Sequence, residues 1–164
     1  MMYITEITSP IGQLTLASDG AALTGLWIQD QKYFGSTLGD DPRISPDLPI
    51  FQETCDWLDA YFSGAPLRAR PNLSPKGSPF RQAVWKLLLE IPHGETSTYG
   101  KLAEQLRQRG IPASAQAVGG AVGHNPIMIL IPCHRILGAD GSLTGYAGGL
   151  DVKRSLLSLE TLYK

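Results

Sequence analysis

The stretch from Pro126 to Leu137, PIMILIPCHRIL, constrains the fold more than any other part of the sequence. Its five consecutive apolar residues, 127–131, predict a fully buried strand, because the run is too short for most helices. Pro132 would end that strand, since proline has no N–H to donate to a ladder and restricts its own φ. The three residues that follow are Cys133, His134 and Arg135.

A thiol beside an imidazole and a guanidinium is the arrangement that activates a cysteine nucleophile, because a cationic neighbourhood favours the thiolate. A buried structural cysteine is the alternative, since free cysteine is among the most buried residue types. Neighbouring residues of an extended chain point to opposite faces. Contact between Cys133 and His134 therefore requires a turn at Pro132 or a bridging water.

Composition indicates a soluble protein with enough apolar residues for a core: 43% of the 164 residues are hydrophobic. Two distant cysteines argue against a disulfide framework and fit a reducing cytoplasm, and we expect Cys55 to be a small core residue. The three histidines lack metal-ligand spacing, so we expect no metal and no cofactor. No stretch is long enough to span a membrane, and we expect a cytoplasmic protein.

The N-terminal half alternates apolar and polar residues between turn signals, which is typical of an antiparallel meander. Its predicted strands are 3–9, 12–17 and 22–28. A polar loop at 29–49 and a helix near 47–63 follow, and residues 67–78 read as a linker. We therefore predict an α+β protein with a sheet-plus-helix scaffold domain at 1–74.

The remaining domain, 75–164, is predicted to be mostly helical. Ser78 and Pro79 start a helix at 79–90, and His93 in the turn after it is expected to be solvated. Helices at 98–107 and 115–122, joined by a short turn, indicate a helix-turn-helix of the winged-helix-like kind, a motif that purely structural helix pairs also produce.

Gly119 and Gly120 lie inside the 115–122 helix, where each glycine costs about 1 kcal/mol relative to alanine. Such residues suggest the close approach of a packed helix or of a nucleic-acid groove. Only Gln116 on this helix could reach a base edge. If the helix binds DNA, we expect it to recognise shape in the minor groove.

Further residues complete the candidate site. Asn125 precedes a proline and marks a sharp boundary whose amide could brace the site. Tyr146, among glycines, offers a flat face for a planar group. Asp151 is predicted to cap a last helix with Leu150, Leu156 and Leu157 on its apolar face. Glu160 shares that inward side, and its natural partner is an imidazole, which gives a relay of Cys133, His134 and Glu160.

The segment IPCHRILGADGSLTGYAGGLDVKRSLLSLE resembles the signature region of the O6-alkylguanine-DNA alkyltransferases. GSPFRQAVWKLLLEIPHGETSTYGKLAEQL and AVGGAVGHNPIMIL also resemble that family. The resemblance covers roughly residues 77–160, whereas the N-terminal half matches only in general layout.

The resemblance implies a DNA-repair protein that flips an alkylated guanine out of the duplex and moves the alkyl group to Cys133. O4-alkylthymine stays open as a second substrate. His134 would act as base through a water, and Glu160 would orient it. The substrate would meet Tyr99 as a hydrogen-bond donor, Tyr146 as a pocket wall, backbone groups of Cys133, Ile136 and Ala147, and Asn125 as a hinge. A thioether offers water no carbonyl to attack, so one turnover per molecule is expected.

The expected partner is double-stranded DNA, bound through the minor groove by a monomer associated with the nucleoid, with no membrane partner. The DNA-binding residues would be Ser114, Gln116, Ala117, Gly119, Gly120 and Arg135. The family usually carries an arginine at the position of Gln116, which lacks that charge and stacking plane. A net charge of −1 argues against strong non-specific binding, but residues 66–164 hold twelve of the fourteen basic residues.

Two other functions stay open. A cysteine-dependent hydrolase could use the same relay, but it would turn over many times and ignore DNA. A lesion-binding module that recruits repair factors would keep its affinity and its biological effect after Cys133→Ala.

Overall fold

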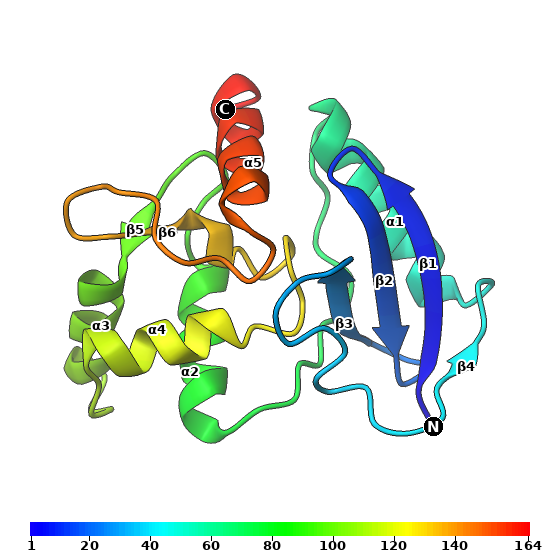
Figure 1. Ribbon diagram of the computed structural model, residues 1–164, viewed down its shortest axis with the longest axis horizontal. Helices are drawn as coiled ribbons and strands as arrows, with labels where there is room; N and C mark the ends of the chain where they lie inside the picture. Colours follow the sequence, from blue (N-terminus) through cyan, green and yellow to red (C-terminus); the bar gives the residue numbers. More distant parts are fainter. The chain divides into compact units, whose positions relative to one another are not determined.

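Two strands, β1 (Tyr3–Ser9) and β2 (Gly12–Ser18), form an antiparallel hairpin at the start of the computed structural model. β3 (Leu23–Ile28) pairs antiparallel with β2, which confirms the predicted meander. A short strand that the sequence pattern did not predict, β4 (Arg43–Ile44), pairs parallel with β1. The sheet therefore has the order β3-β2-β1-β4 (Figure 1).

Helix α1 (Pro49–Ser63) packs against β2 and β3. It has proline in its first turn and ends at Gly64, whose φ of 77° permits the left-handed cap. Its buried face includes Phe51, Leu58 and Tyr61. Cys55 lies beside this face and is only half-buried, so the expectation of a core cysteine is wrong.

Every residue of β3 is buried, because its outer edge is covered. Leu23 bridges to Leu73, and Leu26 bridges to Ile127, which returns to this sheet from far along the chain. The structure describes residues 1–164 as two compact units: residues 1–76 with 126–128, and residues 77–125 with 129–164.

The second unit begins with three helices that start where the hydroxyl residues predict. They are α2 (Pro79–Leu89), α3 (Tyr99–Gln108) and α4 (Ala115–Gly123). In each helix the side chain before the first turn accepts a backbone N–H, which satisfies one of the unpaired donors there. These caps are Ser78, Thr98 and Ser114.

Helices α3 and α4 are joined by a short turn, as the predicted helix-turn-helix requires. Arg107 Nη1 donates to Ala113 O at 2.8 Å and fixes that turn. The Trp85 indole on α2 donates to Ala121 O on α4 at 2.9 Å within the buried core. Hydrogen bonds from both α2 and α3 therefore help to hold α4 in position.

A two-stranded parallel ladder and a last helix complete the second unit. The strands are β5 (Ser97–Thr98) and β6 (Ile136–Leu137). Helix α5 (Leu150–Leu162) begins after Gly149, so the prediction that Asp151 is its N-cap is wrong and Asp151 lies in the first turn. Leu150 is 43% exposed, which removes it from the predicted apolar face. No helix is both long and apolar enough to cross a membrane.

The strand predicted at 127–131 is a buried turn. The apolar run correctly indicates burial, but Ile129 has a φ of 70°, which a strand does not allow. Asn125 Nδ2 donates to Ile131 O at 2.8 Å and satisfies a carbonyl that a ladder would otherwise pair. A side chain outside the apolar run thus helps to hold its turned backbone.

Candidate active site

Cys133 and His134 lie in a single turn of 3₁₀ helix, η1 (Cys133–Arg135). Cys133 N donates to Ile131 O at 2.8 Å across Pro132, whose φ of −81° and ψ of 63° form an inverse γ-turn. A turn is therefore present at Pro132, which is one of the two arrangements that contact between Cys133 and His134 would need. All three residues of η1 are buried.

The Cys133 thiol lies in an environment that disfavours its charge. Burial raises the pKa of Cys133 to about 11, while a hydrogen bond from Asn125 and the positive charge of Lys153 act in the opposite direction. At neutral pH the resting side chain is therefore a thiol. A base must remove its proton before the sulfur can act as a nucleophile.

His134 and Glu160 form the predicted contact inside the protein. Burial alone would raise the pKa of the Glu160 carboxyl, but its interactions with His134 and Arg135 hold that pKa well below its usual range. Because an ionised carboxylate only accepts hydrogen bonds, His134 Nε2 carries the hydrogen and donates to Glu160 Oε2.

The other imidazole nitrogen is the one that can take up a proton. Burial lowers the pKa of His134, although Glu160 acts in the opposite direction. The ring is therefore neutral at pH 7, with its lone pair on Nδ1, and Nδ1 is buried without a hydrogen-bond partner in the protein. Glu160 fixes the tautomer, so Nδ1 is the basic atom of the site.

Arg135 does not face solvent, and the prediction that it contacts DNA is wrong. Its side chain is 4% exposed. Its Nε donates to Glu160 Oε1 at 2.7 Å, and its Nη1 donates to Ile91 O at 2.6 Å. The position of Arg135 directly after His134 in the sequence does not tell which way its side chain points.

Lys153 is a buried member of the site that the sequence reading missed. Its Nζ donates to Ile136 O at 2.5 Å and to Thr144 O at 2.8 Å, and its charge acts on Cys133. Lys153 precedes Leu156 by three residues and Glu160 by seven, a spacing that places all three on one helical face. That spacing could have identified it.

The residues expected around a substrate come from several elements of the second unit. Tyr99, at the start of α3, accepts a long hydrogen bond from Thr144 at 3.5 Å. Ile136 is buried, Ala147 is half-buried, and the Tyr146 hydroxyl is buried. Asn125 is buried, and its side chain hydrogen-bonds both to Cys133 and to Ile131 O in the preceding turn. The roles of these residues in binding stay predictions.

Helix α4 exposes most of the residues predicted to bind DNA. Gln116, Ala117 and Gly120 are exposed, as is the cap Ser114. A side-chain carbon added at Gly119 would lie 3.7 Å from the Tyr99 ring, whereas one added at Gly120 would meet no atom within 4 Å. No part of the protein therefore explains the glycine at 120.

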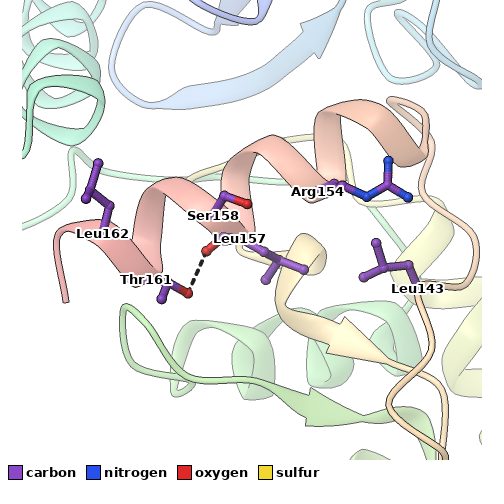
Figure 2. A pocket seen from close by; sticks show the side chains of 6 residues that line it. All are labelled: Leu143, Arg154, Leu157, Ser158, Thr161 and Leu162. Carbon is purple, nitrogen blue, oxygen red and sulfur yellow. Dashed lines mark hydrogen bonds between the residues drawn. The ribbon is translucent and has the colours of Figure 1, made fainter.

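Two further features are the side chain of His93 and a groove along α5. His93 is half-buried and its Nδ1 is buried, so the expectation of a solvated side chain is wrong. A groove of about 510 Å³ runs along α5 (Figure 2). It is lined by Leu143, Arg154, Leu157, Ser158, Thr161 and Leu162. None of the predicted site residues lines it.

Comparisons with known proteins find relatives over nearly the whole chain. Residues 79–162 match the family model described as 6-O-methylguanine DNA methyltransferase, DNA binding domain, and residues 2–75 match its ribonuclease-like domain. The chain is 48% identical over 160 residues to the methylated-DNA–protein-cysteine methyltransferase of Mycobacterium tuberculosis, covering 98% of this chain and 93% of that protein. The corresponding Haemophilus influenzae protein is 43% identical over 164 residues, covering 98% of this chain and 87% of that protein.

A solved structure extends this likeness to three dimensions. The crystal structure of Mycobacterium tuberculosis OGT in complex with DNA matches with a TM-score of 0.88 and 45% identity. The match covers 98% of this chain and 94% of that one. Both the resemblance and the α+β fold predicted from the sequence are thereby confirmed. The chain belongs to the 6-O-methylguanine DNA methyltransferase family.

Proposed function

We propose that this chain repairs DNA by moving an alkyl group from the O6 atom of guanine to the sulfur of Cys133. The observation that carries the proposal is the buried thiol followed by a neutral imidazole, whose tautomer an ionised carboxylate fixes. Relatives named methylated-DNA–protein-cysteine methyltransferase support the same reaction. O4-alkylthymine is a second substrate that the same chemistry allows.

The reaction would begin with removal of the thiol proton of Cys133. His134 Nδ1 takes it from Cys133 through a water, and the sulfur attacks the alkyl carbon. The S–C bond forms as the C–O6 bond breaks, and the electron pair of that bond stays on the guanine. The proton ends on the guanine, so no co-reactant is needed. The thioether is stable to water, and each molecule therefore acts once.

DNA would be bound through the second unit. The exposed face of α4 combines Gln116 with small residues, which suits close approach to a minor groove. The damaged base would have to leave the stack, because a target atom inside a duplex cannot reach a buried sulfur. We propose that one molecule acts alone, with residues 75–164 performing transfer and 1–74 as scaffold. It would work at the nucleoid in the reducing cytoplasm, where Cys133 stays a thiol.

Stoichiometry separates this function from its rivals. An excess of duplex carrying O6-methylguanine should lose one methyl group per protein molecule and no more, and Cys133→Ser should remove none. Repeated turnover, or activity on esters without DNA, would indicate a hydrolase. Lesion binding without any loss of methyl from the oligonucleotide would indicate a recruiting module.

A further inference from the structure

Arg135 links three segments of the second unit around the candidate relay. Its guanidinium donates to Glu160 Oε1 on α5 at 2.7 Å and to Ile91 O, just after α2, at 2.6 Å. It is itself part of η1, directly after His134. A planar, forked guanidinium can hold two acceptors in fixed directions, which lysine cannot do.

The fork decides which carboxylate oxygen faces the imidazole. Glu160 Oε1 accepts from Arg135 and also, at 3.4 Å, from Gly94 N. Oε2 is then the oxygen left to accept from His134 Nε2. With both oxygens engaged, the carboxylate cannot rotate without breaking a charge-assisted hydrogen bond.

The guanidinium also balances the charge of Glu160. A carboxylate beside an imidazole favours imidazolium, which has no lone pair on Nδ1 to accept a proton. The charged groups that act on His134 are Glu160, Arg135 and Lys153; those that act on Glu160 are His134 and Arg135. Arg135 therefore opposes the effect of Glu160 on the ring.

We infer that Arg135 is a positioning residue for alkyl transfer, which holds Glu160 in place and keeps His134 an unprotonated base. The inference rests on the proposed function, because it assigns Arg135 a part in that reaction. This positioning role replaces the predicted contact of Arg135 with DNA, because the side chain is buried and donates to Glu160 and Ile91 within the protein.

The pH profile of single-turnover transfer tests the inference in Arg135→Gln. Loss of the guanidinium should raise the pKa of Glu160, which loses a cationic donor, and that of His134, which loses a repelling charge. Both groups would then bind protons at higher pH. The acid limb of the rate should move to higher pH. The rate at pH 7.5 should fall roughly tenfold to hundredfold, by analogy with the loss of a partner that orients a metal-ligating histidine.

Two further variants separate charge from geometry. Arg135→Lys keeps the charge but not the fork, so its acid limb should stay near that of the wild type while its rate falls. In a Glu160→Gln background, Arg135→Gln should lower the rate at pH 7.5 little further, because the positioning effect of Arg135 acts through that carboxylate. The slope of log affinity for DNA against log salt should not change in Arg135→Gln.

Other outcomes would overturn the inference. A uniform loss of rate at every pH in both variants would leave Arg135 a purely structural role, and a salt slope lowered by about one would make it a phosphate contact. If circular dichroism shows Arg135→Gln unfolded, Arg135→Lys decides: a wild-type rate, or a displaced acid limb, would contradict the inference. Failure of the proposed function can be told apart from failure of this inference, because the wild-type protein would then transfer no methyl group to Cys133.

Discussion

At the scale of single residues, the proposed mechanism depends on groups that are held in particular protonation states. Cys133 is a thiol, His134 is neutral and Glu160 is ionised. Sequence spacing predicted that Glu160 points inward, and it is 1% exposed. Spacing could not predict the direction of Arg135, because that direction depends on Ile91 and Glu160, which lie far away in the sequence.

Glu160→Gln should slow transfer by roughly 10²–10⁴-fold, the range found when an acid–base partner is lost. Glutamine can occupy the same space, but it cannot stabilise the imidazolium that forms when His134 takes the thiol proton. Single-turnover kinetics with methylated duplex would measure this, while affinity for undamaged duplex should stay the same. An unchanged rate would remove Glu160 from the mechanism.

The same groups make stability depend on pH. Folding depresses the pKa values of His134 and Glu160 below their ordinary values of 6.5 and 4.5. Below those values the unfolded chain binds more protons, so the free energy of unfolding should fall as pH drops from about 6.5, and fall further from about 4.5. Urea unfolding at a series of pH values would measure it.

Glu160→Gln should be less stable than the wild type at pH 7 and should lose less stability below pH 4.5. Glu95→Gln, which changes an exposed carboxylate, serves as the matched control and should follow the wild-type curve. Parallel curves for the wild type and Glu160→Gln would show that Glu160 is not the group that titrates.

At the scale of elements, the N-cap residues predicted the helix starts correctly, whereas the apolar run at 127–131 wrongly indicated a strand. Ser78, Thr98 and Ser114 mark helix starts because their hydroxyls satisfy backbone donors locally. The residues at 127–131 read as a strand because hydrophobicity reports burial and not φ. The two-residue strand β4 is too short to carry an alternating pattern.

Helix α4 offers a test of groove contact that does not involve charge. Gly120→Ala should stabilise the protein by up to about 1 kcal/mol, because an interior glycine weakens a helix and the added carbon meets no protein atom. It should nevertheless weaken DNA binding if the groove approaches this face. The wild-type protein is the reference, and unchanged DNA affinity in Gly120→Ala would place the DNA elsewhere.

The substitution Gln116→Arg tests the same face of α4 by adding a charge. Gln116→Arg should tighten duplex binding at low salt and steepen the dependence of log affinity on log salt by up to about one unit. A larger, charged side chain should also hold the gap left by an extruded base, so repair should gain more in duplex than in single strands. Equal gains on both substrates would show that Gln116 does not fill that gap.

At the scale of the whole molecule, charge divides between the two units. The first unit has nine acidic and five basic residues, and the second has six acidic and nine basic residues. The net charge of −1 therefore hides a basic unit that carries α4 and the candidate site. The net charge of the whole chain therefore understates the suitability of the second unit for DNA, as the distribution of basic residues along the sequence already indicates.

The central claim is that Cys133 receives the alkyl group, and peptide mass spectrometry tests it most directly. After incubation with duplex containing O6-methylguanine, the digest should show one methyl group on Cys133 and none on Cys55, the half-buried cysteine that serves as internal control. The methyl-bearing protein should account for all methyl lost from the DNA. A methyl group on Cys55, or an unmodified Cys133 beside repaired DNA, would contradict the account.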